Sequence, residues 1–254
     1  MEQKINDIKK LFQAADEKML PELIQCYTAD ERAGVQSVIA SANKRLEAFE
    51  KEKKRSFELL KYEREYSAYS YICGIDEVGR GPLAGPVVAG AVILPKDCDI
   101  LYINDSKQLS EKKREELYEV IMDKAVATGL GYATPERIDE INILQATYEA
   151  MREAINALGV QPDLLLNDAV TIPGLSMKQV PIIKGDAKSV SIAAASIVAK
   201  VTRDRYMEEM DAAYPGYGFA GHKGYGTAEH RDAILRLGPC PIHRRSFLTR
   251  IIGG

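Results

Sequence analysis

Residues 74–86 of the chain read Gly74-Ile75-Asp76-Glu77-Val78-Gly79-Arg80-Gly81-Pro82-Leu83-Ala84-Gly85-Pro86. An apolar run, residues 71–75, carries two adjacent acids to its end, and a glycine-rich turn with one arginine follows. Glycine tolerates unusual dihedrals and lets a ligand come close to the main chain. A second apolar run over residues 85–94 leaves the turn. The pattern predicts two strands joined by a turn that exposes backbone N–H groups beside two carboxylates.

The two adjacent acids, Asp76 and Glu77, are the first candidates for chemistry. Successive side chains of a strand point to opposite faces, so the two carboxylates can share one metal only if the strand ends or bends there. A surface hairpin with two solvated acids is the alternative interpretation. The apolar residues on both sides of the acids argue against it, because unpaired charges are costly in such surroundings.

A nucleotide-binding loop is a further alternative for the glycine-rich turn. Gly79 and Gly81 follow a strand, as in a dinucleotide fingerprint, but Pro82 stands where that loop would open into a helix. The residues after the turn read as a strand instead, and the chain has no G-x-x-x-x-G-K-[ST] motif. We therefore expect no nucleotide cofactor.

Length and composition indicate a soluble globular protein. The chain has 254 residues, 46% of them hydrophobic and 28% charged, which allows one large domain or one domain with an appendage. The net charge of -3 does not by itself predict a nucleic-acid partner. Residues 200–254, however, carry nine Lys and Arg against six Asp and Glu, a local excess of +3.

The cysteines and the apolar runs bear on location. The four cysteines lie far apart and form no C-x-x-C pair, which argues against zinc and redox roles and fits a reduced, cytoplasmic protein. No apolar run reaches the roughly 18 residues of a membrane span, and the N-terminus lacks the core of a signal peptide. We expect no membrane association.

Residues 1–68 differ in texture from the rest of the chain, with a single glycine and a single proline. Apolar spacing predicts a short amphipathic helix near residues 5–12 and a long helix over about residues 30–65. The polar face of the long helix carries both signs of charge and is typical of a solvated surface; an arm that docks nucleic acid or a protein is the lesser alternative. We expect a helical N-terminal extension over residues 1–68 whose partner is unknown.

Strands and helices alternate after residue 69. Further strands are expected at residues 128–133, 163–168 and 179–184, and helices at residues 110–127, 135–158 and 227–237. Alternation of this kind predicts an α/β fold with a partly parallel sheet and helices on its faces. The small residues 193–196 would let a helix press closely against that sheet.

Two of the later strands also end in acids, Asp168 and Asp186. Sites in open α/β sheets gather at the carboxyl ends of strands, so these side chains are expected to join Asp76 and Glu77. Carboxylates gathered there would repel one another unless a cation neutralises them. Because only oxygen ligands are present, Mg²⁺ or Mn²⁺ is expected rather than Zn²⁺.

Several polar residues are candidates for phosphate or base contacts. Lys188 and Ser189 follow Asp186 and lie near the acids in sequence. Tyr225 lies in residues 214–227, where aromatic residues stand among glycines beside a lysine, as in loops that stack on sugars or bases. The three histidines have no convincing ligand spacing and are expected in loops or on helix surfaces.

Taken together, four motifs resemble bacterial ribonuclease HII, of the type 2 ribonuclease H family. The motifs are residues 74–86; residues 105–109, Asp-Ser-Lys-Gln-Leu; residues 184–186, Lys-Gly-Asp, with 193–204, Ala-Ala-Ala-Ser-Ile-Val-Ala-Lys-Val-Thr-Arg-Asp; and residues 221–227, Gly-His-Lys-Gly-Tyr-Gly-Thr. The likeness covers about residues 70–250. The sister family, ribonuclease HIII, differs at the first motif and carries a mixed α/β domain in front.

The resemblance implies a ribonuclease H-like mixed sheet flanked by helices, with residues 69–254 forming the catalytic domain and its C-terminal helical substrate-binding part. It implies a monomeric, metal-dependent endoribonuclease that cuts the RNA strand of RNA–DNA hybrids and cuts 5′ to ribonucleotides embedded in duplex DNA. The products would carry a 3′-hydroxyl and a 5′-phosphate.

Roles of single residues are also implied by the resemblance. The family's four acids fall on Asp76, Glu77, Asp168 and Asp186, which would hold two Mg²⁺ or Mn²⁺ ions. Residues 79–81, Gly79, Arg80 and Gly81, would contact the 2′-hydroxyl through backbone groups, and Tyr225 would stack on the next deoxyribose. Lys107, Lys188 and Ser189 would contact phosphates.

Two departures from the family pattern stand out. Ala169 follows the third acid where the family often has glycine, and residues 1–68 exceed the common core of the family. Two other functions remain open at this point, a non-hydrolytic nucleic-acid binding module and a junction resolvase on the same scaffold.

Overall fold

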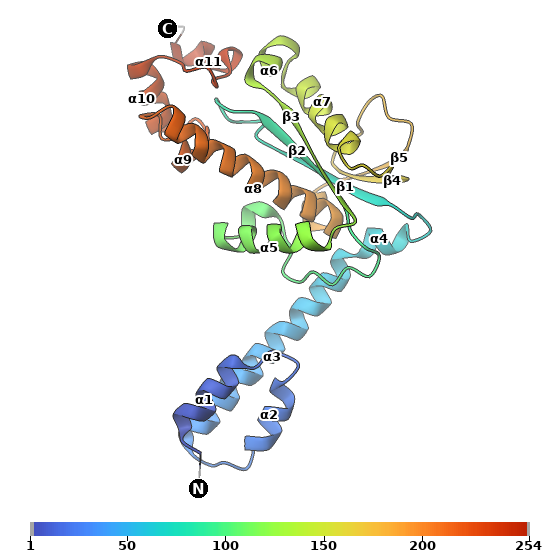
Figure 1. Ribbon diagram of the computed structural model, residues 1–254, viewed down its shortest axis with the longest axis vertical. Helices are drawn as coiled ribbons and strands as arrows, with labels where there is room; N and C mark the ends of the chain where they lie inside the picture. The colour runs from blue at the N-terminus through green and yellow to red at the C-terminus, as the bar shows by residue number, and fades with distance from the viewer. Residues whose placement is uncertain (1–2, 253–254) are drawn as a thin grey trace. The chain divides into compact units, whose positions relative to one another are not determined.

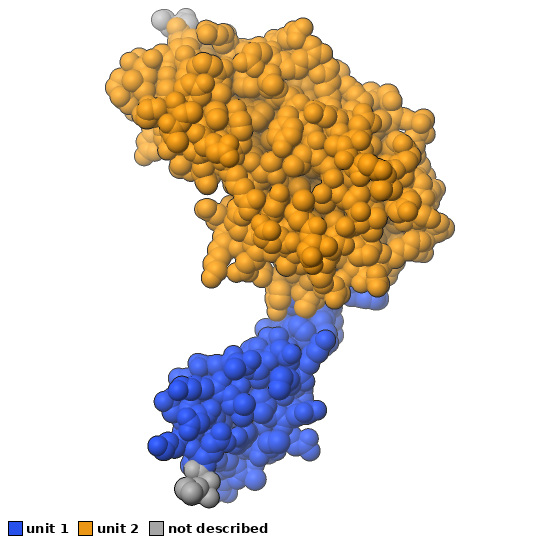
Figure 2. Space-filling view, viewed as in Figure 1, with its two compact units in different colours: residues 1–58 blue, residues 59–254 orange. Residues whose placement is uncertain are grey.

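The computed structural model describes residues 3–252 and divides the chain into two compact units. Unit 1 is residues 1–58 and unit 2 is residues 59–254 (Figure 2). Unit 1 is built from helices, whereas unit 2 combines helices with a sheet. The functional division predicted after residue 68 stays a prediction.

Unit 1 contains the helical N-terminal region that the sequence predicts. Helix α1 is Ile5–Ala14, α2 is Leu20–Tyr27 and α3, Ala33–Leu59, begins in this unit. The predicted helix over residues 30–65 is interrupted, because α3 ends at Leu59 and a separate short helix, α4 Lys61–Glu65, follows. Helix α2 was not predicted, although Pro21 suits its first turn.

The core of unit 1 is a single apolar cluster between α1, α2 and α3. Its buried members are Ile8, Phe12, Ala15, Leu20, Val35, Ile39 and Ala42. Beside the cluster, Arg45 of α3 donates hydrogen bonds to the carbonyl oxygen of Ala15 at 2.6 Å and to Glu17 at 2.8 Å, which connect α3 to the segment after α1. None of the four predicted acids belongs to this unit.

The sheet of unit 2 is mixed, as predicted (Figure 1). Its strands are β1 Ile72–Val78, β2 Val87–Ile93, β3 Ala127–Ala133, β4 Leu164–Asp168 and β5 Lys178–Ile182. They lie in the order β3-β2-β1-β4-β5. The pairs β1–β2 and β2–β3 are antiparallel, whereas β1–β4 and β4–β5 are parallel.

Helices cover both faces of the sheet (Figure 1). The long helix α8, Val190–Ala213, packs on one face together with α5, Glu111–Lys124, and α7, Ile143–Asn156, packs on the other. The sequence predicts one helix over residues 135–158, but the structure has α6 Pro135–Ile141 before α7. The break falls at Asn142, whose φ of 73° leaves the helix and whose side chain caps α7.

The remaining elements of unit 2 are short. They are the 3₁₀ turns η1 Ser106–Gln108 and η2 Gly185–Ala187 and the helices α9 Phe219–His222, α10 Ala228–Leu237 and α11 Arg245–Ile252. Ser110 and Thr227 cap α5 and α10, each accepting a backbone N–H. Within residues 3–252, no helix is both long enough and apolar enough to cross a membrane.

Glycines in the sheet let α8 come into direct contact with β1 and β2. A Cβ placed on Gly74 would lie 2.0 Å from the carbonyl carbon of Ser191, and one on Gly90 would lie 2.5 Å from the carbonyl oxygen of Ala195. Both neighbours are main-chain atoms of α8 and cannot move aside as a flexible side chain could. This contact is the reason for the small residues predicted to press against the sheet.

A methyl group at Gly74 should therefore force α8 away from β1. We expect Gly74→Ala to lower the free energy of unfolding by about 3 kcal/mol, the upper range for overpacking a core. Gly221→Ala is the matched control, since a Cβ at Gly221 meets no atom within 4 Å. Urea denaturation of both variants measures the difference, and equal stability of the two would contradict the close contact.

Candidate active site

The four predicted acids lie at the ends of neighbouring strands. Asp76 and Glu77 belong to β1, and Asp168 is the last residue of β4. Asp186 lies in η2, in the connection from β5 to α8. The carboxyl ends of β1, β4 and β5 reach the same edge of the sheet because these strands are parallel.

The register brings two of the acids to equivalent positions. The last paired residues of β1 and β4 are Ile75 and Asn167, so Asp76 and Asp168 each follow directly. Strand β1 does not end at its acids, since its pairing with β2 continues to Val78. One metal shared by Asp76 and Glu77 was expected only if the strand ended or bent at these acids, and β1 does not end there. Both carboxylates nevertheless lie close enough to Asp168 for its charge to raise their pKa values.

Asp76 is the most deeply buried of the four acids, with 6% of its surface exposed. Burial raises its pKa well above the usual range, and the charges of Glu77 and Asp168 add to that effect. A hydrogen bond from Ser196 of α8 acts in the opposite direction. The carboxylate form of Asp76 is therefore disfavoured unless a cation lies nearby.

Glu77 and Asp186 each have a basic side chain beside them. Burial raises the pKa of Glu77, while Arg80, with its Nη1 3.4 Å from Oε1, opposes the rise. Burial and the charges of neighbouring acids raise the pKa of Asp186, while Lys107, with its Nζ 4.0 Å from Oδ2, opposes the rise. Lys107 thus lies beside the acids, and its contact with a phosphate stays a prediction.

Asp168 has a main-chain partner instead. Its Oδ1 accepts the backbone N–H of Gly185 at 2.7 Å, which ties the end of β4 to η2. The acids are consequently held by separate partners, and among residues 3–252 no three His, Cys, Asp or Glu side chains already form a group that could hold a metal ion. Their donor set consists of carboxylate oxygens, which suits a hard divalent cation.

The residue after Asp168 explains one departure noted in the sequence. Ala169 adopts a φ of 56°, in the left-handed region that favours glycine, and its N–H donates to the carbonyl oxygen of Ile182. The turn that a glycine would make is therefore present, at a cost of roughly 1–2 kcal/mol for the alanine side chain.

The predicted ribose-reading residues also come together. Arg80 and Gly81 are exposed, and a Cβ on Gly81 would lie 3.8 Å from Cε1 of Tyr225. Tyr225 is 43% exposed, and its loop is joined to the turn by a hydrogen bond from the N–H of Leu83 to the carbonyl oxygen of Gly224 at 2.8 Å. Arg80, Gly81 and Tyr225 thus line one stretch of surface, and Gly79 is buried next to them in the chain.

The other two phosphate candidates lie beyond Asp186. Lys188 is exposed at the start of α8. Ser189 is buried, donates to Glu63 at 2.6 Å and accepts the N–H of Ile192, so it caps α8. A phosphate contact for Ser189 stays a prediction that these bonds do not support. The partner Glu63 lies in α4, far from Ser189 in the sequence, and nothing in the sequence indicated that the two residues would form a hydrogen bond.

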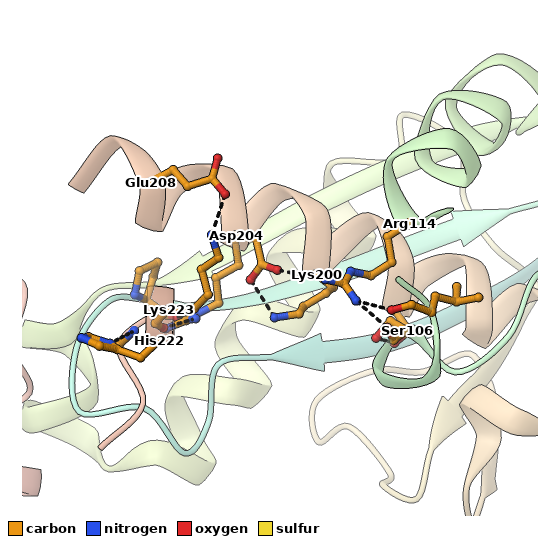
Figure 3. Close-up of polar contacts among 12 residues, drawn as sticks. Ser106, Arg114, Lys200, Asp204, Glu208, His222 and Lys223 are labelled. Carbon is orange, nitrogen blue, oxygen red and sulfur yellow. Dashed lines mark hydrogen bonds and ion pairs between the residues drawn. The ribbon is translucent and has the colours of Figure 1, made fainter. Parts of the chain in front are cut away.

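Polar side chains of helix α8 form ion pairs with residues that lie in or contact the loops around the site (Figure 3). Asp204 accepts from Lys200 at 2.7 Å and lies 3.8 Å from Arg114, which itself donates to the carbonyl oxygen of Ser106. Farther along the helix, Glu208 accepts from Lys223 at 2.5 Å. Both the loop that carries Lys107 and the loop that carries Tyr225 are therefore anchored to α8.

The three histidines form one cluster; His243 lies in a loop and His222 at the end of α9, as expected, but the burial of His230 and His243 was not expected. His230 and His243 are buried and their Nε2 atoms lie 3.0 Å apart, while His222 stacks on His230 at 4.3 Å between ring centroids. Sequence spacing missed the cluster because the residues come from three separate segments.

Hydrogen bonds fix the proton positions in this cluster. His243 Nδ1 accepts the N–H of Cys240, so its Nε2 carries the proton and donates to Nε2 of His230. His230 Nδ1 then donates to the carbonyl oxygen of Tyr225 at 2.9 Å. The chain of bonds requires both rings to be neutral, and it holds the backbone of Tyr225 in place.

Comparison with protein families gives two matches. A family described as Ribonuclease HII matches residues 73–250, and one described as Ribonuclease HII N-terminal domain matches residues 4–67. The ribonuclease HII of Lachnoclostridium phytofermentans is 62% identical over 248 residues, covering 98% of both chains. That of Clostridioides difficile is 51% identical over 250 residues, again covering 98% of both. The N-terminal region is thus shared with such relatives rather than an addition to them.

Solved structures match about two thirds of the chain or more. Ribonuclease H2 from Pyrococcus horikoshii OT3 has a TM-score of 0.59 and 30% identity, covering 70% of this chain and 93% of that one. RNase HII from Archaeoglobus fulgidus, solved in a complex with PCNA, has a TM-score of 0.58 and 28% identity over 70% and 94% of the chains. An RNase HIII solved with Mn²⁺, at 19% identity, has a TM-score of 0.51 and supports the fold alone.

The histidine cluster predicts acid sensitivity. Burial lowers the pKa of His230 to about 4, so the unfolded chain binds the proton more readily than the folded one. Stability from the neutral ring is complete above about pH 6.5 and is lost as the pH falls toward 4; after allowance for solvent screening we expect a loss of about 1 kcal/mol by about pH 5.

Thermal denaturation between about pH 8 and pH 5 measures this loss. The His230→Gln variant should be less stable at neutral pH and should lose less on acidification, because the titrating ring is gone. A pH dependence as steep in His230→Gln as in the unaltered protein would show that His230 does not titrate as described.

Proposed function

The chain belongs to the ribonuclease HII family and is therefore a metal-dependent endoribonuclease, and we propose that it hydrolyses the RNA strand of RNA–DNA hybrids and cuts 5′ to ribonucleotides embedded in duplex DNA. Each cut would leave a 3′-hydroxyl and a 5′-phosphate. The gathering of Asp76, Glu77, Asp168 and Asp186 at one edge of the sheet is the observation that carries this proposal.

The acids are suited to bind divalent metal ions. Burial and mutual repulsion raise the pKa values of Asp76, Glu77 and Asp186, so a bound cation would relieve an unfavourable arrangement. We propose that the four carboxylates hold two Mg²⁺ or Mn²⁺ ions. Such ions would supply an activated water and stabilisation of the leaving 3′ oxygen.

The basic side chains beside the acids would take a second role in the loaded enzyme. Arg80 and Lys107 lie beside Glu77 and Asp186 at 3.4 Å and 4.0 Å. A divalent cation competes for the same carboxylate oxygens, which would free both side chains for phosphates of the substrate. Both are largely exposed, so they can turn toward a bound strand without unpacking the core.

The surface beside the acids supplies ribose selectivity in this proposal. Gly79 has a φ of 90°, and a Cβ there would lie 2.3 Å from Arg203, so no other residue fits without strain. The missing side chain at Gly79 lets the buried Arg203 lie against the turn, whereas the missing side chain at the exposed Gly81 leaves the main chain open to a 2′-hydroxyl, the group that distinguishes RNA from DNA. Tyr225, next to Gly81, would stack on the following deoxyribose.

The proposal is tested with a labelled DNA duplex that contains one ribonucleotide and with an all-DNA duplex of the same sequence. We expect a single cut on the 5′ side of the ribonucleotide in Mg²⁺ or Mn²⁺ and none in EDTA. Cleavage of the all-DNA duplex would indicate a different nuclease, such as a junction resolvase. Binding without cleavage in every metal would indicate a module that does not hydrolyse its substrate.

Asp76→Asn should abolish cutting while the protein stays folded, because it removes one charged ligand and one source of repulsion. We expect the rate to fall by at least about 100-fold, the scale for removing one electrostatic group at a reacting centre. Asp123→Asn, on the exposed face of α5, is the matched control and should cut normally. Normal turnover by Asp76→Asn would rule out the proposed metal site.

Tyr225→Ala should reduce cutting at a single ribonucleotide by about 10- to 100-fold, the range expected for one lost stacking contact. Long RNA–DNA hybrids should be affected less, because they do not depend on one junction. Tyr225→Phe keeps the ring and is expected to retain activity on both substrates. An equal loss on junction and hybrid substrates in Tyr225→Ala would contradict the stacking role.

A further inference from the structure

Two arginines are completely buried beneath the glycine-rich turn. Arg203 of α8 and Arg244, which directly precedes α11, each have 0% of their surface exposed. Neither forms an ion pair with a carboxylate of residues 3–252; their N–H groups go to main-chain carbonyl oxygens instead. Two buried positive charges without carboxylate partners are costly and call for an explanation.

Arg244 binds the turn itself. Its guanidinium donates to the carbonyl oxygens of Gly79 at 2.5 Å, Arg80 at 2.9 Å, Pro82 at 2.8 Å and Gly85 at 2.8 Å. A planar guanidinium with several fixed donors can hold such a set of carbonyls, whereas a lysine ammonium offers only three donors from one point.

Arg203 holds the second half of the turn in the same way. It donates to the carbonyl oxygens of Ala84 and Pro86, each at 2.9 Å, and to that of Lys223 at 2.8 Å. The last of these bonds lies in the loop that carries Tyr225. The two arginines together therefore fix the turn and its neighbour from below.

Inward carbonyls determine where the N–H groups point. In a trans peptide unit the C=O and N–H bonds are antiparallel, and no cis peptide bond occurs within residues 3–252. The inward carbonyls of Gly79 and Arg80 thus direct the N–H groups of Arg80 and Gly81 outward. Neither N–H has an acceptor within the described part of the chain, and both residues are exposed.

Other N–H groups of the turn are used inside the protein. That of Leu83 donates to Gly224 and that of Gly85 to Ile242, each at 2.8 Å. The outward pair at Arg80 and Gly81 differs from these two N–H groups in having no acceptor within the described residues and in lying at exposed positions. The positive charges of the two arginines lie behind this pair and strengthen its attraction for an electron-rich oxygen.

We propose that Arg244 is a positioning residue for substrate selection: by drawing the carbonyls of Gly79 and Arg80 inward, it presents the N–H groups of Arg80 and Gly81 to the 2′-hydroxyl oxygen of the ribonucleotide. This inference rests on the proposed function, because it assumes a ribonucleotide substrate. Arg244 itself touches no substrate. It acts through the turn, and its loss should affect the recognition of ribose more than the recognition of duplex DNA.

Arg244→Lys tests the inference, since it keeps the charge and removes the fork of donors. We expect kcat/KM on a duplex with one ribonucleotide to fall by about 10- to 100-fold, the effect of losing a few buried hydrogen bonds. Binding of the all-DNA duplex in EDTA should change by less than about two-fold, because it does not involve the 2′-hydroxyl. Arg250→Lys, an exposed position in α11, is the matched control and should match the unaltered protein on both duplexes.

The outcomes separate this inference from the proposed function. If the unaltered protein does not cut the ribonucleotide duplex, the proposed function fails. If the unaltered protein does cut, two results with a folded Arg244→Lys variant would overturn only the role of Arg244. One is an unchanged kcat/KM on the ribonucleotide duplex; the other is a loss of binding to the all-DNA duplex as large as the loss of kcat/KM on the ribonucleotide duplex.

A second measurement applies if Arg244→Lys does not fold. In the unaltered protein, the amide protons of Arg80 and Gly81 should exchange rapidly with solvent, as nuclear magnetic resonance can record. In EDTA, addition of the ribonucleotide duplex should slow their exchange and shift their resonances, whereas the all-DNA duplex should not. Protected amides in the free protein, or the same response to both duplexes, would overturn the inference.

Discussion

The contact between α8 and the sheet is the constraint on which the site depends. Gly74 and Gly90 have no side chain, so main-chain atoms of α8 lie where a Cβ would stand. At this spacing Ser196 of α8 reaches Asp76, and farther along Arg203 reaches the glycine-rich turn. A bulkier helix or a bulkier strand would separate the acids from the side chains that hold them. The small residues are therefore part of the site, although they carry no chemistry.

The alternation of apolar runs with glycine and proline was enough to predict the sheet and the acids at its edge. Those features depend on local pattern and on the rule that parallel strands end at one edge. The points at which helices are interrupted were harder to predict from the sequence. The sequence around Asn142 continues the apolar spacing of a helix, yet Asn142 adopts a positive φ and caps a new one. Local spacing cannot show which of two competing conformations a single residue takes.

Hydrogen bonds between residues far apart in the sequence could not be predicted, for a different reason. Glu63 and Ser189 are 126 residues apart and meet only because α4 and the start of α8 are packed together in the fold. His230 and His243 likewise come from separate segments, and their shared bond has no signature in spacing. Such bonds form only once the fold brings distant segments together, whereas the pattern of a strand is visible in the local sequence. Local pattern therefore predicts the carboxylates at the strand ends but not the side chains that surround them.

The two buried arginines beneath the turn between β1 and β2 are kept apart from the carboxylates, although Arg80 of the turn itself lies 3.4 Å from Glu77. Asp76 lies at the edge of the sheet, and the turn follows it after only a few residues. The buried arginines Arg203 and Arg244 lie beneath that turn. An ion pair between acid and arginine would stabilise both in isolation, but it would remove the need of the carboxylates for a cation and the attraction of the turn for an oxygen. Main-chain carbonyls satisfy the guanidiniums without neutralising them. The turn therefore connects the two strands and also separates the buried guanidiniums of Arg203 and Arg244 from Asp76.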